Sequence, residues 1–345
     1  MSNTEPVPID TLGRPLRDLR ISVTDRCNFR CPYCMPAEIY GEQYTFMPKS
    51  QILTFQEITR LARIFVGLGT EKIRVTGGEP LLRADLPKLI SMLAQLPTRD
   101  LALTTNGNLL PRYAGLLADA GLRRVTVSLD TLNEKVFREM NGGRHGVAAT
   151  LEGIDTAERV GLVPIKINCV VVRGVNHHTI VDLARRFRGT GHTVRFIEYM
   201  DVGNLNEWKL DQVVSAQEII ESIGSVFPLE PLQPNYHGEV ARRFRYADGR
   251  GEIGVVSSVS KPFCGACTRA RLSTDGHLIT CLFASGGVDL RTPLRDGASD
   301  DDLRSLIVGV WHGRRDRYSE DRAGLVTGDG SPHPNHKVEM YQIGG

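Results

Sequence analysis

The sequence carries almost no net charge, because 42 Lys and Arg residues are nearly balanced by 40 Asp and Glu. A net charge of +2 and an ordinary hydrophobic content of 41% give no support for a general nucleic-acid or membrane role. The sequence also lacks internal repeats and low-complexity tracts, and residues 1–18 contain neither a signal-peptide core nor a membrane-spanning stretch. We therefore expect a cytoplasmic protein with no nucleic-acid or membrane partner, long enough for two folded units.

Cysteine is scarce as well, yet six of the seven cysteines fall into two triplets. In a reducing cytoplasm, clustered thiols indicate metal or redox sites rather than disulfides. The remaining one, Cys169, lies in an apolar run and is expected to pack in the core. The first triplet is Cys27, Cys31 and Cys34, and the second is Cys264, Cys267 and Cys281.

The first triplet offers three thiolates to one metal centre. A structural zinc ion takes four ligands, whereas an iron–sulfur cube held by three cysteines leaves one iron open to another ligand. An open iron can bind an amino group and a carboxylate together, and a low-potential cluster can then donate one electron to the bound molecule. The spacing therefore predicts a 4Fe–4S cluster with chemistry at its open iron.

Short β-rich segments alternate with amphipathic segments of helical length between residues 19 and 230. Six such β–α units predict a parallel sheet, and six are too few for an eight-fold barrel but suit an incomplete one. We therefore expect an α/β fold: an N-terminal extension (1–18), an incomplete (β/α)6 TIM-type barrel (19–230) and a smaller C-terminal domain (231–345). The expected strands are 19–24, 72–76, 101–105, 124–129, 164–172 and 193–199; the expected helices are 54–68, 85–96, 112–120, 150–160, 179–187 and 215–222, with Asp85 and Ser215 as N-caps.

Unusual polar residues fall at the C-terminal ends of these strands, which form the functional edge of parallel α/β folds. The pair Gly77-Gly78 leaves the backbone free for close approach to a ligand. Thr105, Ser128 and Met200 follow or end other strands. We therefore expect one edge of the sheet to collect the functional groups.

Two motifs at this edge resemble the radical S-adenosylmethionine superfamily: Cys-Asn-Phe-Arg-Cys-Pro-Tyr-Cys at 27–34 and Gly-Gly-Glu-Pro at 77–80. Further segments, 19–27, 195–201 and the terminal Gly344-Gly345, are similar to the GTP 3′,8-cyclase family of molybdenum cofactor biosynthesis. The similarity covers nearly the whole chain after residue 18. It implies two 4Fe–4S clusters, S-adenosylmethionine as a cofactor, and GTP held between the barrel and a C-terminal domain that carries the second cluster.

The resemblance also implies a role for individual residues. The first triplet would hold the cluster that binds S-adenosylmethionine, and the second triplet the cluster that meets the guanine base. Arginine forks suit phosphate oxygens, so an arginine-rich set for GTP is physically sensible. The S-adenosylmethionine set is Tyr33, Gly78, Ser128 and Met200; the GTP set is Arg20, Arg74, Thr105, Lys166, Arg269 and Arg271; and the catalytic set is Arg195, Gly344 and Gly345, whereas Tyr341 and Gln342 are expected to vary freely.

The implied reaction is a radical cyclisation. A 5′-deoxyadenosyl radical would remove the C3′ hydrogen of GTP, and the carbon radical would attack C8 to give (8S)-3′,8-cyclo-7,8-dihydroguanosine 5′-triphosphate. This reaction needs a cellular one-electron reductant, and its product would pass to the next enzyme of the pathway. A homodimer is compatible with the pattern.

Other interpretations stay open at this point. Zinc sites could be completed by His145 or His192 for the first triplet and by His277 for the second. The basic GTP set could instead form internal salt bridges, a core pair or a solvated surface. Among whole-protein functions, a radical peptide-modifying enzyme and a zinc-stabilised nucleic-acid-binding module, using the basic segment 242–250, are the alternatives.

Overall fold

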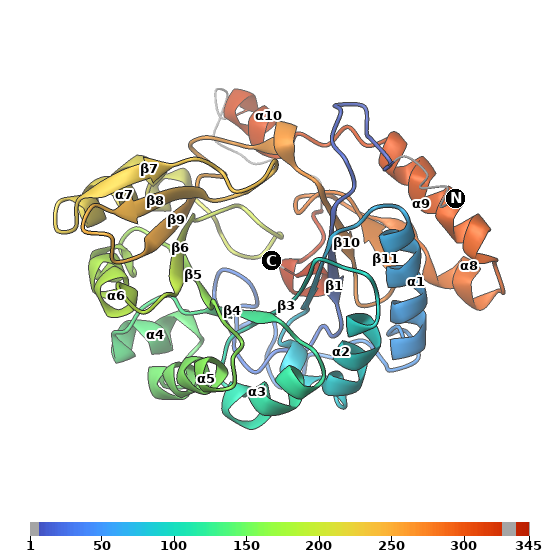
Figure 1. The fold of residues 1–345 in the computed structure, drawn as a ribbon, viewed down its shortest axis with the longest axis horizontal. Helices are drawn as coiled ribbons and strands as arrows, with labels where there is room; N and C mark the ends of the chain where they lie inside the picture. The colour runs from blue at the N-terminus through green and yellow to red at the C-terminus, as the bar shows by residue number, and fades with distance from the viewer. Residues whose placement is uncertain (1–6, 326–335, 345) are drawn as a thin grey trace.

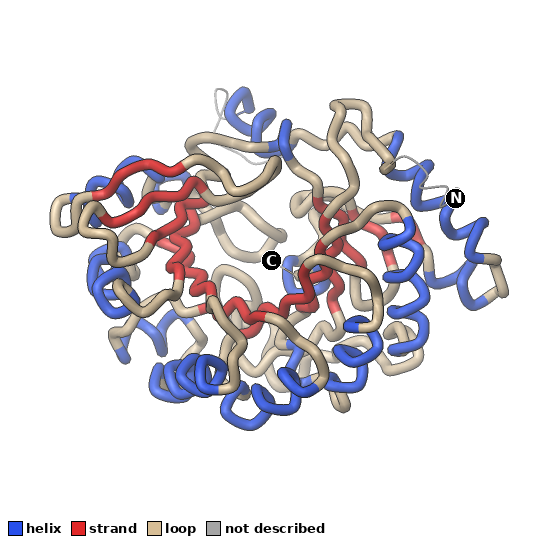
Figure 2. The backbone as a smooth tube through the Cα atoms, viewed as in Figure 1, coloured by secondary structure: helices blue, strands red, loops and turns tan. Residues whose placement is uncertain are grey.

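Residues 7–325 and 336–344 are described by the computed structural model, and they form an α/β fold around one mixed sheet of twelve strands. The strands follow a curve, with most of the helices on its outer side (Figure 1). The same view coloured by secondary structure shows the strands forming the inner wall of this curve (Figure 2). Six strands pair in chain order, each parallel to the next, as the β–α alternation predicts.

All six predicted strands are confirmed, with bounds that differ from the expected ones by at most two residues. Their apolar residues are buried against the outer helices; Ile21, Val75 and Leu103, for example, are fully or almost fully buried. Polar residues alternate with them on the inner side of the curve. The strands are β1 (Asp18–Ser22), β2 (Lys72–Thr76), β3 (Asp100–Thr105), β4 (Arg124–Ser128), β5 (Lys166–Val171) and β6 (Thr193–Glu198).

The six predicted helices are also confirmed, and local caps explain where several begin. Ser215 accepts a hydrogen bond from the Glu218 amide and completes a capping box, as expected for an N-cap. Asp85 precedes its helix as expected, but its backbone is left-handed (φ 58°) and its side chain caps nothing. The helices are α1 (Phe55–Gly67), α2 (Leu86–Ala94), α3 (Leu110–Asp119), α5 (Val147–Arg159), α6 (Ile180–Phe187) and α7 (Ala216–Gly224), together with the unforeseen α4 (Glu134–Met140).

Segments beyond residue 224 extend the same sheet at both edges. At one edge, β9 (Glu252–Val256) pairs parallel to β6, and the hairpin strands β8 (Arg242–Tyr246) and β7 (Leu229–Leu232) follow. At the other edge, β10 (Arg269–Leu272) pairs parallel to β1, and β11 (His277–Ile279) and β12 (Val288–Asp289) follow. The domain division near residue 230 stays a prediction, although the sheet runs across it. The remaining helices are α8 (Arg291–Arg295), α9 (Asp300–His312), α10 (Tyr318–Leu325) and α11 (Met340–Ile343).

The core lies between the sheet and its outer helices. It contains Cys169, which is completely buried, so its predicted role as a packing residue is confirmed. The described part of segment 1–18 is anchored to the second cysteine region, because the backbone amides of Arg17 and Asp18 donate to the carbonyl of Thr268. None of the helices in the described ranges combines the length and apolar character needed to cross a membrane.

Candidate active site

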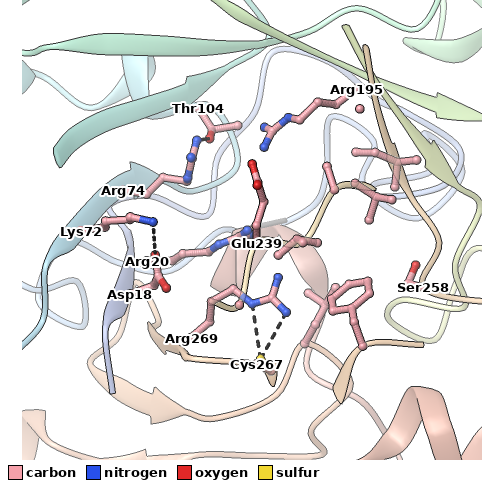
Figure 3. A pocket seen from close by; sticks show the side chains of 18 of the residues that line it. Asp18, Arg20, Lys72, Arg74, Thr104, Arg195, Glu239, Ser258, Cys267 and Arg269 are labelled. Carbon is pink, nitrogen blue, oxygen red and sulfur yellow. Dashed lines mark hydrogen bonds and ion pairs between the residues drawn. The ribbon is translucent and has the colours of Figure 1, made fainter. Parts of the chain in front are cut away.

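A pocket lies on the inner side of the curved sheet, and side chains from β1, β2, β3, β5, β6 and β10 line it. Figure 3 shows several basic side chains from different strands pointing into this space. The second cysteine triplet lines the pocket as well. Its basic lining residues outnumber the acidic ones: they are Arg14, Arg20, Lys72, Arg74, Arg124, Lys166, Arg195, Arg243, Arg269, Arg271 and Arg314, against Asp18, Asp100, Glu239, Glu252 and Asp316.

Strand register places three of these arginines in one row. Arg20 on β1 lies opposite Arg74 on β2, and on its other side opposite Arg271 on β10. Like charges directly opposite each other destabilise a sheet. A fold that keeps such a row facing a pocket is therefore suited to an anionic ligand.

Most acidic groups of the lining are already used by other cations. Asp100 binds Arg124, and Glu252 binds Arg243. By contrast, no carboxylate lies within ion-pair distance of the row of three arginines, of Lys166, of Arg195 or of Arg269 in the described ranges, so the salt-bridge interpretation fails there. Arg74 instead donates to the hydroxyls of Thr104 and Thr126 at 2.9 Å each. Glu239, on the loop between β7 and β8, points toward this group of cations (Figure 3).

Burial, and after it the neighbouring positive charges, lower the pKa values of these cations. Burial, followed by the charges of Arg195 and Arg124, lowers the pKa of Lys166 from its ordinary 10.5 to about 7. Burial and the neighbouring Arg74 lower the pKa of Arg195 to about 9, and burial lowers that of Arg74 to about 10. A bound anion would oppose these shifts, because its negative charge stabilises the protonated forms.

The second triplet lies in cationic surroundings. Arg269 donates to the Cys267 sulfur through Nε at 3.4 Å and through Nη2 at 3.2 Å, as the dashed lines in Figure 3 show. Burial alone would raise the pKa of the Cys267 thiol, but the charges of Arg269 and Arg314 outweigh it and lower the pKa to about 6. Cys267 is therefore prepared to act as a thiolate ligand. Arg271 is also buried rather than solvated.

The first triplet has the opposite electrostatic surroundings. Burial, with a further effect of Glu79, raises the pKa of Cys27 to about 12. Burial and the other two thiols raise the pKa of Cys31. The thiols of Cys27 and Cys34 are near enough to raise the pKa of Cys31, and a metal cluster that takes all three as thiolates removes the cost of ionising them.

Backbone hydrogen bonds attach the Gly77-Gly78-Glu79 segment to the loop that leads into the first triplet. The Gly78 amide donates to the Thr24 carbonyl at 2.8 Å, and the Glu79 amide to the Arg26 carbonyl at 2.7 Å. A Cβ on Gly78 would lie 2.3 Å from the Arg26 carbonyl oxygen, so only glycine allows this approach. The two motifs singled out in the sequence are therefore one structural unit.

Glu79 links this unit to the end of β3. Its buried carboxylate accepts hydrogen bonds from the amides of Leu81 and Asn106 and from the Thr105 hydroxyl. Burial raises its pKa to about 7. Thr105 therefore serves the first-triplet side, and it does not line the pocket as its assignment to GTP required. Thr104, one residue earlier and on the other face of β3, lines the pocket instead.

The four residues assigned to S-adenosylmethionine lie around the same edge. The Tyr33 hydroxyl donates to Asp130 at 2.9 Å, just beyond the end of β4 at Ser128. The Tyr33 ring packs on a cluster that includes Tyr199, the neighbour of Met200. Met200 itself lines the pocket, so it lies where the edge of the sheet meets the basic interior.

The chain end reaches the pocket region through α11, which packs against β1. Arg271 donates to the Gly344 carbonyl, and a Cβ on Gly344 would lie 2.0 Å from the Thr76 side chain at the end of β2. Gly344 also has a positive φ of 69°, so both the lack of space and the backbone conformation favour glycine there. Gly345 lies outside the described residues. The expectation that Tyr341 varies freely is wrong, because its ring is buried against Tyr40, at 5.1 Å between centroids.

The histidines proposed as fourth zinc ligands are engaged elsewhere. His277 lies 3.0 Å from Asp275, His145 stacks on Phe29, and His192 lies beside Glu158. Within the described ranges, no three His, Cys, Asp or Glu side chains converge where a single metal ion could bind. A 4Fe–4S cube is a different acceptor, because each cysteine binds a separate iron atom.

Three lining residues, Thr104, Arg14 and Arg314, were missed by the sequence analysis. Thr104 could have been found from strand alternation, because it lies two residues after Ala102 and so on the same face of β3, and both line the pocket. Arg14 and Arg314 could not, because they reach the second triplet from remote segments. Both are almost completely buried.

Comparisons with known proteins agree with this geometry. The Radical SAM superfamily matches residues 21–187, and the family described as Molybdenum Cofactor Synthesis C matches residues 192–320. The proteins named GTP 3′,8-cyclase from Acidothermus cellulolyticus and Xanthomonas axonopodis pv. citri are 55% and 52% identical to the chain. The first alignment covers 99% of this chain and 100% of the relative, and the second covers 97% and 98%.

Among solved structures, Streptococcus suis SuiB bound to its precursor peptide SuiA has a similar fold, with a TM-score of 0.59 and 17% identity over 86% of this chain and 67% of that chain. At this identity the likeness concerns the fold alone. The near full-length identity to the cyclases goes further. The chain belongs to the GTP 3′,8-cyclase family of the radical S-adenosylmethionine superfamily.

Proposed function

We propose that the protein is a GTP 3′,8-cyclase, which uses S-adenosylmethionine to convert GTP to (8S)-3′,8-cyclo-7,8-dihydroguanosine 5′-triphosphate in the first step of molybdenum cofactor biosynthesis. The row formed by Arg271, Arg20 and Arg74 supports this proposal most directly, because three like charges face one pocket and have no carboxylate partner among the described residues. A triphosphate is the polyanion that such a row would neutralise. A neutral peptide substrate would leave the charges uncompensated.

The first triplet would hold the 4Fe–4S cluster that binds S-adenosylmethionine, because Cys27, Cys31 and Cys34 are partly buried on the loop that packs against the Gly78 backbone. When bound, this cluster supplies the electron that cleaves S-adenosylmethionine. The chain's own part is to hold the ligand: the Gly78 backbone bounds the site and Tyr33, fixed by Asp130, offers its ring. Ser128 and Met200 would complete the contacts.

The second triplet would hold a second 4Fe–4S cluster inside the GTP pocket, since all three of its cysteines line that pocket. Arg20, Arg74, Lys166, Arg269 and Arg271 would bind the triphosphate and orient the nucleotide. The sets of residues lie on one curved sheet, so the ribose can be held between them while water is excluded. Arg195, held by Asn168 at 2.9 Å, would steer the substrate, and the Gly344 backbone would pack beside it.

The same proposal includes the finer architecture, namely an incomplete (β/α)6 barrel at residues 19–230 and a C-terminal domain at residues 231–345 that carries the second cluster. A cellular one-electron reductant, transfer of the product to the next enzyme of the pathway, a cytoplasmic location and a homodimer also belong to this proposal.

The test is anaerobic reconstitution with iron and sulfide, followed by incubation with S-adenosylmethionine, dithionite and GTP. Formation of 5′-deoxyadenosine together with a cyclised nucleotide is expected, and guanosine without phosphates should be a poor substrate. Each charge-assisted hydrogen bond contributes about 1.5–3 kcal/mol, so Arg74→Met should raise the apparent KM for GTP about 10- to 150-fold.

The exposed Arg63→Met on α1 is the matched control and should behave like the unmodified chain. A reconstituted protein that cleaves S-adenosylmethionine but leaves GTP unchanged would contradict the proposed substrate. Equal KM values for Arg74→Met and Arg63→Met would contradict the phosphate site.

A further inference from the structure

Arg314 is a buried arginine that contacts the second triplet from the segment after α9. It donates to the Cys267 sulfur at 3.2 Å and to the Cys267 carbonyl at 2.7 Å. Its guanidinium also lies over the Trp311 ring, 4.6 Å from the centroid, which fixes its plane. This side chain is therefore held in one orientation, with its fork directed at Cys267.

A second buried arginine, Arg14, supports the other cysteine of the same loop. It donates to the Cys264 carbonyl at 2.9 Å, and Asp10 binds both Arg14, at 2.5 Å, and Arg314, at 3.4 Å. The side chains of Asp10, Arg14 and Arg314 are at most 1% exposed. The second terminal nitrogen of Arg14 is also buried, yet the described residues supply no partner for it, although Arg14 lines the pocket.

Burying three charged side chains costs more free energy than an apolar replacement of similar volume usually would. Arg14 and Arg314 share the buried carboxylate of Asp10, and the partly exposed Asp316 also pairs with Arg314 at 3.1 Å, so two carboxylates balance the two arginines next to the second triplet. An unpartnered buried nitrogen adds to that cost. Packing alone does not explain this arrangement, whereas an anionic sulfur cluster at the triplet would strengthen the hydrogen bond that Arg314 donates to the Cys267 sulfur and would offer an acceptor to the unpartnered Arg14 nitrogen.

We propose that Arg314 and Arg14 are positioning residues of the second cluster, which hold the 264–267 loop as a preformed ligand and raise the reduction potential of the cluster that it binds. This inference rests on the second cluster of the proposed function. Hydrogen bonds to cysteine sulfur and nearby positive charge stabilise the reduced, more negative cluster, and so raise its potential. Arg269 donates to the same sulfur from β10, whereas Arg314 reaches it from the segment after α9; both line the pocket.

The first triplet provides the contrast within one chain. Its buried neighbours include the carboxylates of Glu79 and Asp130. The buried Arg30 donates to the Cys27 carbonyl at 2.7 Å, but within the described residues no arginine donates to a sulfur of this triplet. Negative neighbours disfavour addition of an electron. The two clusters should therefore have separate potentials, with the second reduced more easily than the first.

The experiment measures the potential of the second cluster alone. In the full chain, Cys27, Cys31 and Cys34 are all changed to Ser, so that only the second cluster gives an electron paramagnetic resonance signal on reduction. Arg314→Met and Arg314→Lys are added to this background, and the exposed neighbour Arg315→Met is the matched control. Iron and sulfide content, the circular dichroism melting curve and a redox titration are recorded for each protein.

Arg314→Met should move the midpoint to a more negative potential, and at a fixed applied potential should lower the ratio of reduced to oxidised cluster at least tenfold, which equals 59 mV for one electron. Arg314→Lys keeps the charge but loses the fork, so its shift should be smaller. Arg315→Met should not shift.

An Arg314→Met midpoint equal to that of Arg315→Met, with full iron content and an unchanged melting curve, would overturn the inference. Should Arg314→Met not fold, Arg314→Lys takes its place, and an unshifted midpoint in that folded variant counts against the inference equally. If the Cys-to-Ser background itself binds no iron and sulfide, the second cluster fails, and this inference fails with it. That result differs from an unchanged potential in a fully loaded protein.

Discussion

Lys166 should make GTP binding depend on pH in a way that can be calculated. Its pKa is about 7 in the free protein, because burial and the neighbouring arginines disfavour its charge. A bound triphosphate supplies the missing negative charge and should return the pKa toward the ordinary 10.5. Binding is therefore coupled to uptake of a proton, and the affinity must fall as the pH rises above 7.

The magnitude follows from linkage. With these two pKa values, the affinity is nearly constant below pH 6 and falls about 15-fold between pH 7 and pH 8.5. Proton uptake on binding should be about 0.5 at pH 7 and about 0.9 at pH 8. Arg195, with a pKa of about 9, stays mainly protonated over this range and adds little to the slope.

Anaerobic isothermal titration calorimetry without S-adenosylmethionine measures both quantities when it is repeated in buffers of different ionisation enthalpy. Lys166→Met should bind GTP more weakly at pH 7 and should lose the slope. Lys88→Met, an exposed change on α2, should keep it. An affinity that is the same at pH 7 and pH 8.5 in the unmodified chain, or a slope that persists in Lys166→Met, would refute the reasoning.

Four further predictions test other parts of the site. Gly344→Ala places a methyl group at an occupied position with positive φ, so the cyclised product should be lost while 5′-deoxyadenosine still forms, as chromatography of both would show. Tyr341→Ala should have the same effect because it removes the 3.1 Å contact with the Tyr44 hydroxyl and the ring packing, whereas Tyr341→Phe should retain most of the activity. Burial raises the Glu79 pKa to about 7, so the folded state holds this proton more tightly than the unfolded state, and stability is lost as the pH rises from 4.5 to 7. Glu79→Gln cannot ionise, so its free energy of unfolding, measured with denaturant, should increase relative to that of the unmodified chain by about 2–3 kcal/mol across that pH range. A difference that stays constant with pH would contradict this. Cys169→Ala should cost about 1 kcal/mol of unfolding free energy with full activity, and a loss of iron in this variant would contradict its assignment to the core.

The order of the first six strands and helices was predictable because it depends on local patterns. Alternation of apolar residues in segments such as 72–76, and glycines at positive φ such as Gly121 and Gly161 after helices, act over a few residues. The strands β9 and β10, which flank the six predicted strands, were not predicted as parts of the same sheet. Their partners, β6 and β1, lie about 60 and 250 residues away along the chain, and pairing over such distances leaves no local signal.

The sequence by itself determined the chemistry that the chain can use, because each cysteine triplet and the Gly77-Gly78 motif is defined by spacing along the backbone. Only the tertiary structure decided which charges face one another. Strand register set Arg20 between Arg74 and Arg271, and the choice of face gave the pocket Thr104 rather than Thr105. The contact of Arg314 with Cys267 joins residues 47 positions apart through folding alone, and no spacing rule could have revealed it.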